Sequence, residues 1–219
     1  MSPGILDPTV SEITAGGPPP VRPPGRGSGG GGGDNDGARQ PDTSPLAIFG
    51  MWVALIPILM LFLAFVSAYV LRHGTGSDWV RGSVPRIVWV NTVLLIASSG
   101  LLERARRLVQ QNGRFRPWVM ATLMFGVAFV IGQVFAWISL TAQGVYLSTS
   151  PYASFFFLLT ISHAVHVAGG LAGLVAAALW PQRGWRGTPP ATTVRVIAIY
   201  WHFLAILWLL LFGLLEIWR

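Results

Sequence analysis

The chain has 219 residues, of which 53% are hydrophobic and 11% are charged, and its mean hydropathy is +0.58. This balance is too apolar for an ordinary soluble domain. The sequence contains no cysteine, which excludes disulfides, thiolate zinc sites, iron–sulfur clusters and c-type haem attachment. The net charge of +7 does not indicate nucleic-acid binding, because the arginines lie in the N-terminal segment and beside apolar runs rather than in a basic soluble domain.

The first 45 residues are rich in glycine and proline, as in the stretch "GGPPPVRPPGRGSGGGGG". Such a segment cannot bury enough apolar surface to fold, so residues 1–45 are predicted to form a disordered tail. The segment lacks the charged start and apolar core of a secretory signal, and we expect it to stay on the cytoplasmic side of a membrane.

Residues 46–219 contain five apolar stretches of more than 20 residues, and about 20 residues suffice to cross a bilayer as a helix. The predicted spans are about 46–71, 87–109, 117–141, 152–180 and 194–218. The fold class predicted from this pattern is an all-α integral membrane protein, a bundle of five transmembrane helices that follows the tail.

Loop arginines predict the orientation of these spans. Eight arginines lie between the second and third spans and between the fourth and fifth, whereas four lie on the opposite side. The N-terminus is therefore predicted to be cytoplasmic and the C-terminus periplasmic.

Small and polar residues recur at helical spacing inside four of the spans, where polar groups are costly unless they face protein or water. These residues are Asn91 and Ser98 in the second span, Gln133 in the third, His163, His166, Gly169, Gly170 and Gly173 in the fourth, and His202 and Glu216 in the fifth. Glycines let helix backbones approach closely, and polar side chains hydrogen-bond across helices. The pattern predicts contacts between helices or with a partner subunit.

Two histidines three residues apart, His163 and His166, could instead share a metal ion with His202. No cysteine exists to complete such a set, and the carboxylates nearest to the spans, Glu103 and Glu216, lie close to span ends. We therefore expect the histidines to pack and hydrogen-bond between helices. A contact with lipid or a partner subunit stays open as an alternative, and so does a metal site.

Four motifs occur in order on successive spans: "WVNTVLLIASSG", "FGVAFVIGQVFAW", "ISHAVHVAGGLAGL" and "YWHFLAILWLLLF". Together they resemble subunit III of haem–copper terminal oxidases over residues 46–219, in the short bacterial form with five spans. By this resemblance, His163, His166 and His202 match histidines of the family, Asn91 and Ser98 match its polar positions on the second span, and Gln133 matches its glutamine on the third.

The resemblance implies a non-catalytic subunit of a cytochrome c oxidase, without catalytic residues, cofactor or metal of its own. Haem and copper would lie in partner subunits. The chain would pack against catalytic subunit I, with subunit II and a small subunit IV nearby, and would support proton-coupled oxygen reduction and the stability of the complex. It would lie in the bacterial inner membrane among phospholipids.

Four alternatives remain open from the sequence. Two lie within the wider family: a subunit III-like accessory protein of nitric oxide reductase, and a quinol oxidase subunit III. The other two are a free-standing haem- or metal-binding redox enzyme, which would need cofactor bound to the isolated chain, and a small transporter. The scarcity of charged residues inside the spans argues against the transporter.

Overall fold

The computed structural model describes residues 44–75, 85–179 and 189–217. Within them the chain forms five α-helices and no β-strand, and each helix is long and apolar enough to cross a membrane. The helices are α1 (Ser44–Thr75), α2 (Ile87–Gln110), α3 (Arg116–Ala142), α4 (Pro151–Leu179) and α5 (Pro190–Ile217). The predicted all-α membrane fold is thus confirmed. The predicted tail lies outside the described residues, apart from its last two, which begin α1.

Prolines set the start of three helices. Pro151 is the first residue of α4, Pro190 is the first of α5, and Pro117 is the second of α3. Proline suits the first turn of a helix, because its ring presets φ and its missing N–H needs no partner there. This explains why α5 begins four residues before the predicted span. Pro57 lies inside α1, which continues through it.

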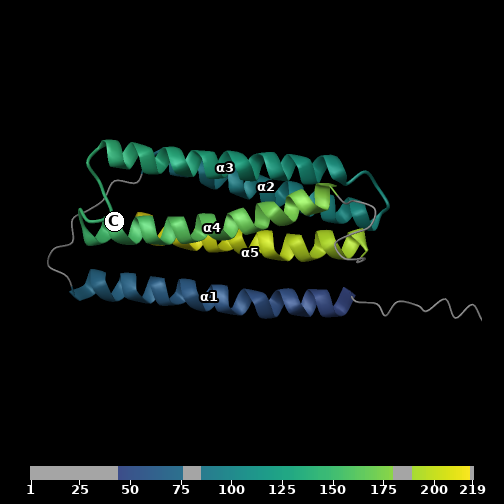
Figure 1. Ribbon diagram of the computed structural model, residues 1–219, viewed down its shortest axis with the longest axis horizontal. Helices are drawn as coiled ribbons and strands as arrows, with labels where there is room; N and C mark the ends of the chain where they lie inside the picture. Colours follow the sequence, from purple (N-terminus) through teal and green to yellow (C-terminus); the bar gives the residue numbers. More distant parts are fainter. Residues whose placement is uncertain (1–43, 76–84, 180–188, 218–219) are drawn as a thin grey trace, which may run out of the picture. The chain divides into compact units, whose positions relative to one another are not determined.

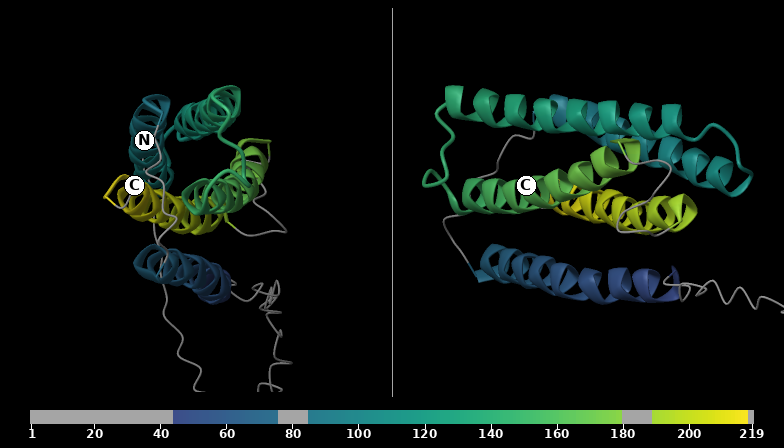
Figure 2. Two further views of the ribbon diagram at one scale, coloured as in Figure 1. Left: turned by 90° about the vertical axis from the view of Figure 1, so that its left-hand side faces the viewer. Right: turned by 45° about the vertical axis from the view of Figure 1, so that its right-hand side comes forward.

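Four helices close into a ring. In it α2 packs against α3 and α5, and α4 packs against the same two helices. Figure 1 shows α3 beside α2 and α5 beside α4, and Figure 2 shows the same helices from two further sides. The helix α1 lies outside the ring, in contact with α4 and α5.

Large side chains fill the ring. Trp201, Trp208, Phe129 and Leu95 are each at most 1% exposed and belong to a core cluster drawn from α2, α3, α4 and α5. A second cluster, which includes Phe62, joins α1 to α4 and α5. In its most apolar window α1 buries 11% of its residues, against 33–44% in the other four helices. Its remaining surface therefore faces lipid or a partner.

Candidate functional site

An amide pair joins α2 to α3. Asn91 and Gln133 are both buried, and the Asn91 Nδ2 atom donates a hydrogen bond to Gln133 Oε1 over 3.3 Å. A Cβ atom on Gly132 would overlap Asn91 Oδ1, so a larger residue here would displace the Asn91 amide. The structure thus brings together two residues that the sequence placed on separate stripes.

Two tryptophans of α5 reach across the core to hydroxyl groups of α2. The Nε1 atom of Trp201 donates to Ser98 Oγ, and that of Trp208 donates to Thr92 Oγ1, each over 3.0 Å. Each hydroxyl also donates to a carbonyl of its own helix, Leu95 O or Val88 O. Both indoles are buried, and a buried indole N–H needs an acceptor. These bonds therefore tie α5 to α2 at two levels.

The same arrangement links α3 to α4. Trp137 Nε1 donates to Thr160 Oγ1 over 3.0 Å, and that hydroxyl donates to Phe156 O over 2.6 Å. Tryptophans in membrane spans often serve as belt or packing aromatics, and the sequence pattern assigned no hydrogen bond to Trp137, Trp201 or Trp208. The seven-residue spacing of Trp201 and Trp208, which puts both on one helix face, is the signal that could have revealed the α5 pair.

Glycines make room for Trp201. A Cβ atom at Gly126 of α3 would lie 2.7 Å from the indole ring, and one at Gly170 of α4 would lie 2.9 Å from it. Two other predicted glycines face α5 less tightly: a Cβ at Gly169 would lie 3.5 Å from the Tyr200 hydroxyl, and one at Gly173 would lie 3.6 Å from Ile197. The fourth-span glycines thus face α5, with Gly170 at the closest approach.

His163 is fully buried among aromatic rings. Its ring centroid lies 5.1 Å from that of Trp208, 6.0 Å from that of Phe129 and 6.4 Å from that of Phe62. Neither ring nitrogen has a hydrogen-bond partner among the residues that the structure describes. Packing is therefore what the structure shows for His163, whereas the sequence led us to expect packing and hydrogen bonding.

His166 lies one turn further along α4 and faces α1. Its Nδ1 atom is 2.7 Å from Ser162 O, and its ring packs edge-on against Phe62 at 5.5 Å. Its carbonyl oxygen accepts a hydrogen bond from the hydroxyl of Tyr200 on α5 over 3.0 Å. His166 therefore lies where α1, α4 and α5 meet.

His202 points to the outside of the ring. Its Nδ1 atom shares a hydrogen bond of 2.5 Å with Ser99 Oγ, and its Nε2 atom lies 3.7 Å from Glu103 Oε2. Glu103 in turn accepts hydrogen bonds from Arg106 and Arg107. Glu103, which the sequence places close to the end of the second span, is the centre of a polar cluster between α2 and α5.

The residues of α5 at helical spacing from His202 follow this outward direction. His202, Ala205 and Leu209 line an open groove between α5 and α2. Gly213 has no atom within 4 Å of a Cβ position in the described structure, and Glu216 is partly buried near the end of α5. The sequence predicted that His202 and Glu216 contact other helices or a partner subunit. The structure directs His202 and Leu209 outwards, because the tryptophans of the adjacent face fill the interior.

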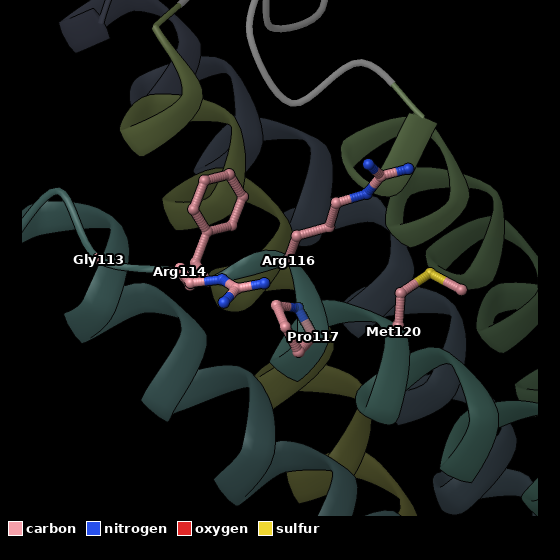
Figure 3. A pocket seen from close by; sticks show the side chains of 6 residues that line it. Gly113, Arg114, Arg116, Pro117 and Met120 are labelled. Atoms are coloured by element: carbon pink, nitrogen blue, oxygen red, sulfur yellow. The ribbon is translucent and has the colours of Figure 1, made fainter.

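A basic corner lies at the turn between α2 and α3. Figure 3 shows Arg114 and Arg116 beside Pro117 and Met120, which line a shallow pocket of about 480 Å³. The guanidinium of Arg104 lies over the Trp118 ring at 5.1 Å. Such a corner suits a membrane surface with anionic headgroups.

In the described ranges no group of three or more His, Asp or Glu side chains is placed to hold a metal ion. The polar side chains instead join helices to one another or line the α2–α5 groove. The fold and these contacts define a multi-pass helical membrane protein whose interior is held by interhelical hydrogen bonds and glycine contacts.

The sequence profile of "Cytochrome c oxidase subunit III" matches residues 46–219, and the chain belongs to this family. A cytochrome c oxidase subunit 3 of Thermostichus vulcanus is 31% identical over 78% of this chain and 86% of its own length. A cytochrome c oxidase subunit 3 of Corynebacterium diphtheriae is 30% identical over 74% of this chain and 83% of its own length. A quinol oxidase subunit 3 of Bacillus subtilis is 29% identical over 79% of this chain and 87% of its own length.

Proposed function

We propose that the chain is the non-catalytic subunit III of a bacterial aerobic terminal oxidase. In this role it packs against catalytic subunit I, stabilises the complex and supports proton-coupled oxygen reduction. The observation that carries the proposal is the family match, which runs through residues 46–219 and so includes all five described helices.

The contacts of the polar residues support a structural role. Asn91 and Gln133 bond to each other, and Ser98 bonds to Trp201. His163 lies in an aromatic enclosure. These side chains are engaged in holding helices together, which is what a subunit needs in order to present a rigid membrane surface to its neighbours.

Cytochrome c is the electron donor that we propose for the complex, because two of the three relatives described above are named cytochrome c oxidase subunits. The Bacillus subtilis relative is named a quinol oxidase subunit, which makes quinol the second candidate. Oxygen uptake by the purified complex with reduced cytochrome c or with a quinol separates the two. Faster turnover with the quinol would overturn the choice of cytochrome c.

Purification of the complex by a tag on this chain tests the function itself. We expect subunits I and II, a small subunit IV and phospholipids to travel with the chain, together with haem absorbance. Recovery of nitric oxide reductase subunits would favour the accessory-protein alternative. Recovery of the chain alone, from membranes that contain an assembled oxidase, would contradict the proposal.

We also propose a bacterial inner-membrane location with a cytoplasmic N-terminus. The chain has no cysteine, so single-cysteine variants can be labelled cleanly. In intact spheroplasts, a membrane-impermeant maleimide should label Ser148→Cys, in the turn between α3 and α4, and should not label Gln111→Cys, at the end of α2. Labelling of Gln111→Cys alone would reverse the orientation.

A further inference from the structure

The groove between α2 and α5 combines polar groups, small residues and apolar walls. Its volume is about 540 Å³, and its lining includes Ser99, Gly100, Glu103, His202, Ala205 and Ile206. His202 keeps 33% of its side chain exposed and Glu103 keeps 25%. These groups are therefore accessible from outside the ring of helices.

The position of His202 along α5 places it within the hydrocarbon core of a membrane. His202 lies twelve residues after the start of α5, which is roughly 18 Å at about 1.5 Å per residue. The hydrocarbon core is about 30 Å thick, so this depth is near its centre. Lipid tails offer neither donors nor acceptors at that level, and polar side chains there need a polar partner.

The described helices provide hydrogen-bond partners for only some of the polar atoms of His202 and Glu103. The Nδ1 atom of His202 is bonded to Ser99, but its Nε2 atom is 3.7 Å from Glu103, beyond hydrogen-bond distance. Glu103 already accepts from Arg106 and Arg107. The nearest described acceptor of the second ring nitrogen of His202 is thus Glu103, at ion-pair rather than hydrogen-bond distance, and His202 lines the groove.

The groove also has the shape for close approach of another backbone. Gly100 is exposed and has no described atom within 4 Å of a Cβ position. Small residues such as Gly100, Ser99 and Ala205 allow transmembrane helices to pack closely, and a polar side chain on the incoming helix can then hydrogen-bond across the contact.

We propose that the α2–α5 groove is the docking site for one transmembrane helix of a neighbouring subunit, which presents a Ser, Thr, Asn or Gln side chain to His202. The incoming helix packs its backbone on Gly100 and supplies the hydrogen bond that lipid cannot supply. The identity of the neighbour as an oxidase subunit rests on the function proposed above.

Cross-linking from inside the groove tests the proposal in the assembled complex. A maleimide–benzophenone on Gly100→Cys should form an adduct with a transmembrane segment of a different subunit. The depth-matched control is Met124→Cys on α3, which is 69% exposed to the outside and should give mainly lipid adducts. Adducts of Gly100→Cys with lipid alone, or with a second copy of this chain, would overturn the proposal.

Filling the groove gives a second, independent readout. Gly100→Trp should lower the amount of chain that co-purifies with the oxidase about tenfold, because the space for the partner backbone is lost. Gly50→Trp is the matched control: Gly50 is an exposed helical glycine on α1 whose Cβ position is also clear of described atoms. An equal yield from the two variants would count against docking in the groove.

Substitutions of His202 separate the contribution of hydrogen bonding to docking from the contribution of shape. His202→Leu should release the chain from the complex in mild detergent, whereas His202→Gln should restore most of the binding because it keeps a donor and an acceptor. Equal binding by the two variants would contradict the hydrogen bond. If wild-type chain brings down oxidase subunits but these groove variants behave as their controls, the docking site is wrong and the proposed function stands. If wild-type chain brings down no oxidase subunit, both fall.

Discussion

Two hydrogen bonds connect the same turns of α2 and α5, one residue apart on each helix. Ser98 pairs with Trp201 inside the ring, where both are fully buried, and Ser99 pairs with His202 on the outside, where the histidine is partly exposed. Successive residues of a helix point about 100° apart, so adjacent hydroxyls serve different surfaces. The inner bond ties two helices together in the core, and the outer bond lies in the groove where we propose that a neighbour docks.

This comparison predicts that the same chemical change should affect different properties on the two surfaces. Changes at the inner positions should lower the free energy of unfolding of the chain in mild detergent. Changes at the outer positions should leave that free energy nearly unchanged and should weaken binding to the complex instead.

Trp201 and His202 should show the largest difference in unfolding free energy between the two surfaces. Trp201→Ala removes a fully buried indole and should lower the free energy of unfolding by roughly 3–5 kcal/mol, because a cavity remains between α2, α3 and α4. His202→Ala should lower it by less than about 1 kcal/mol, since the side chain is partly exposed. Titration with sodium dodecyl sulfate, followed by circular dichroism, measures both. Equal losses would remove the distinction between the two surfaces.

The glycine pair should differ by somewhat less. Gly126→Ala places a Cβ atom 2.7 Å from the Trp201 ring and should destabilise the chain by roughly 1–3 kcal/mol through overpacking. Gly100→Ala meets no described atom within 4 Å and should stabilise α2 slightly, by up to about 1 kcal/mol, because alanine is the better helix former. The same titration applies. A stabilising Gly126→Ala would mean that the core at Trp201 is looser than the structure shows.

The serine pair removes one hydroxyl from each surface. Ser98→Ala leaves the buried Trp201 N–H without its acceptor and should cost roughly 1–2 kcal/mol of unfolding free energy. Ser99→Ala should cost below about 0.5 kcal/mol, because its partner is partly accessible. Thermal unfolding of the two variants side by side gives the comparison, and a larger loss for Ser99→Ala would reverse the assignment of the surfaces.

The smallest effect is expected for the amide pair. A double-mutant cycle of Asn91→Leu and Gln133→Leu should give a coupling energy of about 0.6 kcal/mol, the usual size for hydrogen bonds between transmembrane helices. Detergent unfolding of the four proteins in the cycle provides the value. A coupling indistinguishable from zero would show that close packing at Gly132, rather than the amide bond, joins α2 to α3.

The sequence predicted the five helices well, because each span is long and apolar. It also predicted that Asn91, Ser98, Gln133 and the fourth-span histidines share faces within their helices, since periodicity alone fixes such a face. Which residues share a helix face can be worked out without knowing the neighbouring helix, so this part of the prediction needed only the sequence of each span.

The pairings could not be predicted in the same way. Periodicity says which residues lie together, but not what covers them. For His202 it could not decide between a contact within the bundle and a contact with a partner subunit. A tryptophan in a span can serve in an interfacial belt or as a buried donor. For Trp201, the residues that decide between these two roles are Ser98 and Gly170, which lie on other helices.

The central claim is that the imidazoles and hydroxyls of this chain join helices and subunits, while electron transfer belongs to its neighbours. The most direct measurement is the haem and metal content of the chain after its separation from the purified oxidase. The account predicts that the separated chain carries no stoichiometric haem, iron or copper and that the remaining complex keeps its haem spectrum. Stoichiometric haem or copper on the separated chain, lost in His163→Leu or His166→Leu, would contradict it.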